Sequence, residues 1–279
     1  MKKISLSIGV FLMILFAACK DQKESKEDPV RASSEESKDI TELSDSPRHH
    51  EWIDLEQDGR TLKAFVVYPE KKEKAKPVLV IHENRGLNDW ARVFADKLAE
   101  KGYLVIAPDL ISNTVPGKEL TSDMDSPDEA RTAIYRLDPE QVTKDLDACY
   151  DYIRKDPAGT GEVAVVGFCW GGSQTFRYAT HNPEITSAHV FYGTAPEADS
   201  LLAKIETPVY GYYGGNDNRV NSTLERTKAQ MDSLGKAFEY EIYENAGHAF
   251  MRSGHEANGE PGNKKAHDQA WDRMLKFLK

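Results

Sequence analysis

The chain has 279 residues, and its 46 acidic and 36 basic side chains give it a formal net charge of −10. This acidic balance argues against nucleic acid as a partner, because binding a phosphate backbone requires a basic surface. Three cysteines are too few to imply a disulfide framework. The length that follows a polar N-terminal region, about 230 residues, suits one α/β domain with a single sheet.

The first residues have the pattern of a targeting signal. Lys2 and Lys3 precede an apolar run over residues 8–16 that is too short to span a bilayer comfortably. Small residues lie directly before Cys19, which resembles the lipobox of bacterial lipoproteins. The resemblance implies a signal peptide over residues 1–18, lipidation of Cys19, and a membrane-anchored lipoprotein of the bacterial cell envelope that faces the periplasm or the cell surface. The alternative is an ordinary secretory signal.

Residues 19–48 are rich in Glu, Ser, Asp and Lys and contain few side chains that could be buried. A segment of this composition cannot build a core, so we expect a lipid-anchored, disordered tether. The folded domain is then expected to comprise residues 49–279.

The remaining chain alternates between strand and helix patterns. A turn at residues 57–60 joins two strands into a predicted antiparallel hairpin, and the later strands are nearly continuous apolar runs, as in parallel sheets buried on both faces. Residues 111–138 lack periodicity and are expected to form an irregular, partly helical segment that could cover a site. Strands are predicted over residues 52–55, 62–68, 77–82, 103–107, 162–167, 188–192, 209–213 and 238–243. Helices are predicted over residues 89–101 with Asp89 as N-cap, 139–155, 173–181, 223–234 and 264–279.

This order predicts an α/β fold with a mostly parallel central sheet, an antiparallel N-terminal hairpin and helices on both faces. In such sheets ligands bind at the carboxyl ends of the strands. Residues 163–172 stand out there, because a β-branched strand ends in Gly167-Phe168-Cys169-Trp170-Gly171 and a helical pattern follows. This is the Gly-x-nucleophile-x-Gly elbow, in which small flanking residues let strand and helix approach. The alternative is a tight turn with a buried cysteine.

Three residues with complementary chemistry directly follow three separate predicted strands. They are Cys169, Asp217 and His248, and their order of nucleophile, acid and histidine is that of α/β-hydrolases. His248 is expected to take the thiol proton and return it to the leaving alcohol, while Asp217 orients the imidazole and stabilises its cation. Taken singly, Asp217 could be only a turn residue and His248 only a loop residue.

These motifs resemble the dienelactone hydrolases over nearly all of residues 50–279. The resemblance implies a single-domain α/β-hydrolase with a Cys-His-Asp triad that cleaves esters or lactones through an acyl-enzyme. It also implies that Glu83 holds the thiol proton in the resting state until a substrate displaces it. The residues that carry the resemblance are His82-Glu83 with Gly86-Leu87-Asn88, Ala107-Pro108-Asp109-Leu110, Gly167-Phe168-Cys169-Trp170-Gly171-Gly172, Asp217 and Gly247-His248-Ala249-Phe250.

Further site residues follow from the same pattern and resemblance. An oxyanion hole is expected from the backbone amides of Trp170 and Asn84. Arg252, Arg131 and Arg85 are candidates for binding a substrate carboxylate, and for each the alternative is a solvated surface charge. The histidines lack the spacing of a metal site and the glycines do not complete a phosphate loop, so we expect no metal and no cofactor.

The expected partners are a small ester or lactone and, through the lipid, a membrane; we expect a monomer. Two other function classes remain open at this point. One is a non-catalytic ligand-binding lipoprotein on the same scaffold. The other is a thiol redox protein that pairs Cys149 with Cys169, although Cys149 has the helical spacing of a small buried core residue.

Overall fold

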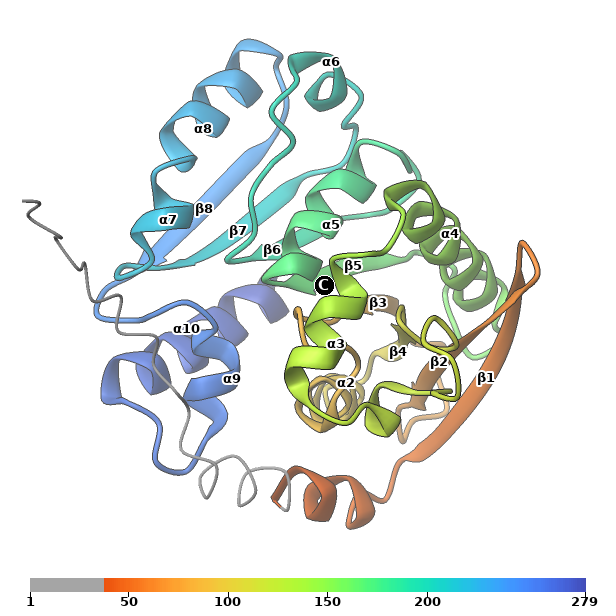
Figure 1. The fold of residues 1–279 in the computed structure, drawn as a ribbon. Helices are drawn as coiled ribbons and strands as arrows, with labels where there is room; N and C mark the ends of the chain where they lie inside the picture. Colours follow the sequence, from red (N-terminus) through yellow and green to blue (C-terminus); the bar gives the residue numbers. More distant parts are fainter. Residues whose placement is uncertain (1–37) are drawn as a thin grey trace, which may run out of the picture.

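An eight-stranded mixed sheet organises residues 38–279, the part of the chain that the computed structural model describes (Figure 1). Its strands are β1 (His49–Gln57), β2 (Arg60–Tyr68), β3 (Pro77–Ile81), β4 (Leu104–Asp109), β5 (Ala164–Phe168), β6 (Ala188–Phe191), β7 (Val209–Gly214) and β8 (Phe238–Tyr243). Their order across the sheet is β1-β2-β4-β3-β5-β6-β7-β8. β2 is antiparallel to β1 and to β4, and the other neighbours are parallel. The predicted N-terminal hairpin and mostly parallel sheet are confirmed.

Helices cover both faces of this sheet, as predicted (Figure 1). The α-helices that follow β3 are α2 (Asp89–Glu100), α3 (Pro127–Ile134), α4 (Pro139–Lys155), α5 (Trp170–Ala179), α6 (Asp199–Leu202), α7 (Asn218–Asn221), α8 (Leu224–Ser233), α9 (Phe250–His255) and α10 (Pro261–Leu278). Apolar residues of α4, α5 and α8 belong to the core on one face, and those of α2 and α10 to the core on the other.

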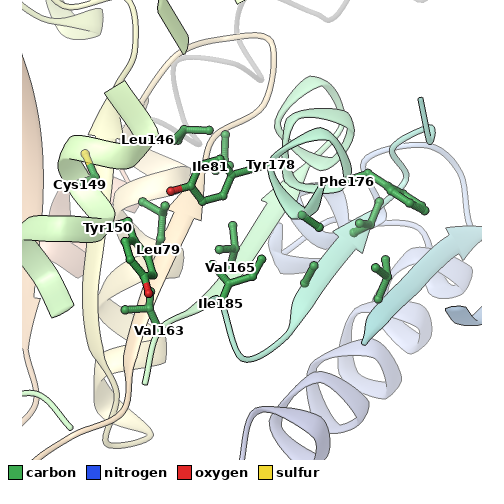
Figure 2. Packing of buried hydrophobic residues seen from close by; sticks show 14 of the residues in the cluster. Leu79, Ile81, Leu146, Cys149, Tyr150, Val163, Val165, Phe176, Tyr178 and Ile185 are labelled. Atoms are coloured by element: carbon green, nitrogen blue, oxygen red, sulfur yellow. The ribbon is translucent and has the colours of Figure 1, made fainter. Parts of the chain in front are cut away.

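The two cores are separate because successive side chains of a strand point to opposite sides of the sheet. All five residues of β3 are buried; Leu79 and Ile81 belong to one core, and Val78 and Val80 to the other. Figure 2 shows the first core, with Cys149 of α4 among its side chains. A strand buried on both faces needs a continuous apolar run, and this is why β3 and β5 can be predicted from the sequence.

Residues 111–138 are partly helical, as expected. They contain a 3₁₀ turn over Thr121–Asp123 and helix α3, whose apolar side chains form a small cluster that packs against Trp170 at the start of α5. Asp109, at the end of β4, accepts hydrogen bonds from the Thr121 backbone N–H at 2.6 Å and from its Oγ1 at 2.7 Å. These contacts tie the segment to the carboxyl edge of the sheet.

Some predicted element ends differ from the structure. The N-cap of α2 is Asn88 rather than Asp89, because the Asn88 side chain accepts from the Ala91 backbone N–H. The last helix begins at Pro261, which supplies no backbone N–H and suits a first turn. The short helices α6, α7 and α9 were not predicted; helices of four to six residues carry too little periodicity to be recognised.

The predicted extent of the disordered tether is wrong for its last part, residues 38–48. Residues 38–44 are helical and dock on the domain. Lys38 Nζ donates to the His255 carbonyl at 3.2 Å, and Lys97 Nζ pairs with Glu42 at 3.1 Å. We call residues 38–48 the N-terminal arm. Most of its contacts are polar, so its sequence lacks the apolar pattern from which a docked helix could be predicted.

Asp96 on α2 fastens the end of this arm. Its carboxylate accepts from Arg48 Nε at 2.8 Å and Nη2 at 2.5 Å, from Ser46 Oγ at 2.6 Å, and lies 2.7 Å from His50 Nε2. Burial alone would raise the pKa of Asp96, but the hydrogen bonds from these three side chains hold it below its ordinary value. Asp96 is therefore a buried anion that needs all of its partners.

The predicted signal peptide, Cys19 and the tether up to residue 37 lie outside the described residues. Within residues 38–279, none of the helices combines the length and apolarity required to cross a bilayer.

The buried contacts of Asp96 predict that Asp96→Asn lowers the free energy of unfolding by about 3 kcal/mol, because Arg48 is left without its carboxylate. Urea unfolding near neutral pH measures this. Glu100→Gln on the same helix is the control, since its side chain is 48% exposed and its loss should cost at most about 0.5 kcal/mol. Equal stability of the two variants would show that the arm is only loosely attached.

Candidate active site

The turn between β5 and α5 holds Cys169 in a strained conformation. Its φ is +53° and its ψ is −114°, outside the regions that side-chain-bearing residues favour. A Cβ at Gly167 would lie 2.2 Å from Thr175 Oγ1, and one at Gly171 would lie 2.2 Å from the His82 carbonyl oxygen. Both positions therefore require glycine, and the predicted elbow is present with a half-buried thiol at its tip.

The structure brings Cys169, His248 and Asp217 together. His248 Nε2 lies 3.1 Å from Cys169 Sγ, and His248 Nδ1 lies 2.5 Å from Asp217 Oδ2. These distances allow one imidazole to exchange a proton with the thiol while its other nitrogen donates to a carboxylate. Three separate elements supply the three side chains, and each residue follows a parallel strand at the same edge of the sheet.

Local contacts hold the acid and the base in place. Asp217 is 7% exposed and caps α7, where its Oδ1 accepts from the Val220 backbone N–H at 3.3 Å. The loop that carries His248 is pinned by a 2.8 Å hydrogen bond from the Gly247 N–H to Asn263 Oδ1 of α10. Ala249 then takes a left-handed conformation, with φ +60°, before α9 begins. The backbone on both sides of His248 is thus held in a defined conformation.

The electrostatics of the group favour a charged imidazole. Burial alone would lower the pKa of His248, but its hydrogen bonds to Asp217 and Cys169, with the charges of both partners, raise it to about 9. Burial would raise the pKa of Asp217, but His248 holds that pKa below its ordinary value. At neutral pH an imidazolium beside a carboxylate is therefore the favoured arrangement, with the thiol sulfur at its other nitrogen.

Glu83 lies beside this group but has other partners than the thiol. It is 5% exposed; Tyr192 donates its hydroxyl to Glu83 Oε1 at 2.9 Å, and Arg252 Nε donates to Oε2 at 3.2 Å. The resemblance implied a contact between Glu83 and the thiol proton. In the structure the thiol instead faces His248, and the carboxylate is held by a tyrosine and an arginine.

Tyr192 is a residue of the site that the sequence analysis did not single out, since it only ends the strand predicted over residues 188–192. It directly follows β6, is 1% exposed and has a φ of +40°, which is rare for an aromatic residue. Its ring meets the His248 ring edge to face with centroids 4.9 Å apart. Its position after a strand next to β5 was the one available signal, since that edge collects the site residues.

The two predicted oxyanion donors belong to two segments that meet at the elbow. Trp170 is the first residue of α5 and directly follows Cys169, so its N–H belongs to the helix N-terminus. Asn84 is half-buried in the loop after β3. The close approach of Gly171 to the His82 carbonyl shows that this loop and the first turn of α5 are in contact.

The three candidate arginines have different surroundings. Arg252 is held at the site between Glu83 and Glu256, and the Glu256 Oε1 lies 3.5 Å from the Arg252 Nη1. Arg131 lies on α3 with a 58% exposed side chain that pairs loosely with Asp128 of the same helix, which favours the alternative of a solvated charge. Arg85 is half-buried in the loop after β3, next to Asn84.

Other chemistries receive no support from the described residues. Residues 38–279 contain no group of three or more His, Cys, Asp or Glu side chains that could hold a metal ion. Cys149 and Cys169 are both free, and they pack with different cores, on opposite faces of the sheet. Burial raises the pKa of Cys149 well above its ordinary value, so this thiol is inert. The redox hypothesis is therefore wrong.

Comparison with known proteins agrees with this geometry. The model of the dienelactone hydrolase family matches residues 62–279. The chain is 31% identical over 202 residues to a carboxymethylenebutenolidase of Pseudomonas putida, and the match covers 70% of this chain and 83% of that protein.

Two solved structures show the same fold. A dienelactone hydrolase of Anabaena variabilis superposes with a TM-score of 0.63 at 18% identity, covering 83% of this chain and 99% of that one. A dienelactone hydrolase-like promiscuous phosphotriesterase from metagenomic libraries has a TM-score of 0.69 at 23% identity, covering 83% and 97%. The predicted α/β-hydrolase fold is confirmed.

The raised pKa of His248 predicts that its contribution to stability is lost with rising pH. Folding raises this pKa from 6.5 to about 9, so the contribution is fully present below pH 6.5 and disappears as the pH passes 9. Urea unfolding of the wild type and of His248→Gln, at about pH 6, 7.5 and 9, should give a stability difference that shrinks at each step. A difference that stays constant would show that His248 folds as a neutral imidazole.

Proposed function

The chain belongs to the dienelactone hydrolase family and is a hydrolase, and from that premise we propose that it cleaves small carboxylic esters or lactones through Cys169, His248 and Asp217. The observation that carries the proposal is the continuous contact from Sγ to Nε2 and from Nδ1 to Oδ2, at 3.1 and 2.5 Å. A thiol, an imidazole and a carboxylate in this order form a nucleophile, a proton carrier and an orienting anion.

In the proposed acylation step the Cys169 thiolate attacks the ester carbonyl, while the thiol proton resides on His248. The carbonyl electrons move to oxygen, and the backbone N–H groups of Trp170 and Asn84 stabilise the oxyanion. The carbon–oxygen bond to the alcohol then breaks, and His248 Nε2 gives its proton to the leaving oxygen. A thioester on Cys169 remains, and a lactone substrate stays attached through its acyl part.

Deacylation uses the same groups. The imidazole is now neutral and accepts a proton from water, whose oxygen attacks the thioester carbonyl. A second oxyanion forms at the same two N–H groups, the carbon–sulfur bond breaks, and the carboxylic acid leaves. The proton that His248 holds then again sits beside the Cys169 sulfur, so no cofactor is consumed.

The charges around Arg252 bear on whether the substrate needs a carboxylate. Arg252 could bind a substrate carboxylate, but it is already shared by Glu83 and Glu256. A substrate anion would have to compete with these two carboxylates for the guanidinium charge. We therefore assign esters and lactones as the class, without requiring a carboxylate on the substrate.

Turnover of an activated aryl ester tests the assignment. Cys169→Ala and His248→Ala should each lower kcat/KM by at least about 10³-fold, because the triad acts as a unit. Cys149→Ala is the matched control. It removes the buried thiol on the opposite face of the sheet, and this variant should turn over the ester at the wild-type rate. Wild-type rates in both triad variants would refute the proposal.

We also propose that the mature chain is a lipoprotein of the cell envelope, attached to a membrane through Cys19. The support is the lipobox-like sequence before Cys19. Because the N-terminal arm is docked from residue 38 onwards, only residues 20–37 lie between the lipid and the domain. Fully extended, this stretch reaches at most about 65 Å.

Cys19→Ala should release the protein from membranes, because the lipid is the proposed anchor. Expression in a bacterial host, followed by separation of membranes and measurement of esterase activity in each fraction, checks this. Equal membrane recovery of the wild type and of Cys19→Ala would rule out anchoring at this cysteine.

A further inference from the structure

His82 is a fully buried histidine that the proposed mechanism does not use. It directly follows β3 and stands immediately before Glu83 and Asn84 in the loop that borders the elbow. Its Nδ1 lies 2.7 Å from the Glu83 carbonyl oxygen, and the Leu110 backbone N–H donates to its Nε2 at 3.3 Å. Both ring nitrogens are therefore occupied by backbone groups.

These two partners fix which nitrogen carries the proton. A backbone N–H can only donate, so Nε2 must be the unprotonated acceptor for Leu110. Nδ1 then holds the hydrogen and donates it to the Glu83 carbonyl, which can only accept. Desolvation by burial lowers the pKa of His82 to about 4, so the imidazole keeps this neutral form at neutral pH.

The Glu83 carbonyl is not an isolated group. It shares a planar peptide unit with the Asn84 N–H, and in a trans peptide the two point in opposite directions. The structure contains no cis peptide bond among its described residues. A hydrogen bond that fixes the direction of the Glu83 carbonyl therefore also fixes the direction of the Asn84 N–H.

His82 also contacts the other half of the proposed oxyanion hole. Its ring stacks on the Trp170 indole with centroids 5.7 Å apart and an interplanar angle of 16°. Its carbonyl oxygen lies 2.2 Å from the position that a Cβ of Gly171 would take, so its backbone touches the first turn of α5. One residue thus touches both segments that supply the N–H donors.

We propose that His82 is a positioning residue that sets the oxyanion hole, by holding the Glu83–Asn84 peptide so that the Asn84 N–H points toward the oxyanion. The inference rests on the proposed function, in which Asn84 and Trp170 stabilise that oxyanion. His82 itself touches no reacting atom. Its effect is on the transition state, so its loss lowers kcat and leaves KM nearly unchanged.

Two reactions of the same sulfur separate this role from a general structural one. Ester hydrolysis forms an oxyanion, whereas alkylation of Cys169 by iodoacetamide displaces iodide and forms none. Both reactions need the thiolate beside His248. The experiment measures ester turnover and, by mass spectrometry of the Cys169 peptide, the alkylation rate of the full chain.

Three substitutions of His82 separate the role of its ring from the roles of its two nitrogens. His82→Phe keeps a flat ring on Trp170 but removes both hydrogen-bonding nitrogens. His82→Gln can place an acceptor near the Nε2 position but has no donor at the Nδ1 position. His82→Asn can place its amide nitrogen near the Nδ1 position and so restores the donor to the Glu83 carbonyl.

The expected result is a loss of ester turnover without a loss of Cys169 alkylation. His82→Phe and His82→Gln lower kcat about 10²-fold, the cost of one misplaced oxyanion donor, with KM and the alkylation rate within about threefold of the wild type. His82→Asn recovers turnover to within about tenfold of the wild type. If His82→Phe does not fold, the comparison between the Gln and Asn variants decides.

His189→Phe is the matched control. His189 is also fully buried in the sheet, with Ser187 Oγ at 3.0 Å and the Tyr212 hydroxyl at 2.9 Å on its two ring nitrogens. It contacts neither oxyanion segment through these bonds. Its loss should destabilise the domain while the ratio of hydrolysis to alkylation stays at the wild-type value.

Several outcomes would overturn the proposal. One is a parallel fall of the hydrolysis and alkylation rates in His82→Phe and His82→Gln, and another is ester turnover within about threefold of the wild type in both variants. A third is a His82→Asn variant whose ester turnover is no higher than that of His82→Gln. The last is failure of all three variants to fold. Failure of the proposed function looks different, because Cys169→Ala would then hydrolyse the ester as fast as the wild type.

Discussion

The close backbone contact at Gly171 is the constraint on which the site depends. The first turn of α5 lies against the carbonyl oxygens of Ile81 and His82, so close that a Cβ at Gly171 would come within 2.4 Å of both. This contact leaves room for only a sharp turn between β5 and α5, and Cys169 accepts a positive φ at its tip. It also places the end of β3 beside the helix N-terminus, so that Cys169 and the loop at Asn84 share one edge of the sheet.

The parallel order of the sheet then collects the remaining groups at that edge. β3, β5 and β7 all run in the same direction, and Glu83, Cys169 and Asp217 follow their carboxyl ends. Charges of opposite sign alternate across the group: Arg252 stands between Glu83 and Glu256, and His248 between Asp217 and the sulfur. Each buried charge therefore has a partner, which is the condition for keeping charged groups out of water.

The parts that could be predicted from sequence are those with a local cause. The apolar runs of β3 and β5 and the glycines around Cys169 each reflect a steric or burial requirement at that position, so the sequence is sufficient to predict the fold and the elbow. The parts that could not be predicted depend on distant partners. Tyr192 is read as a core aromatic until its hydroxyl is seen on Glu83, 109 residues away. The arm is read as a tether until Arg48 is seen on Asp96.

The arm matters to the site because it binds the helix that follows the loop of His248. Its Asp39 and Glu42 lie 3.6 and 3.5 Å from His255 Nε2, at the end of α9, while Arg252 of the same helix reaches Glu83. α9 begins two residues after His248 and is only six residues long, too short to be stable by itself. Its position is therefore set by its contacts with the rest of the domain, which include the core around Phe250 and Met251 and the carboxylates of the arm. The N-terminal arm acts as part of the hydrolase domain that holds this helix, rather than as a spacer before it.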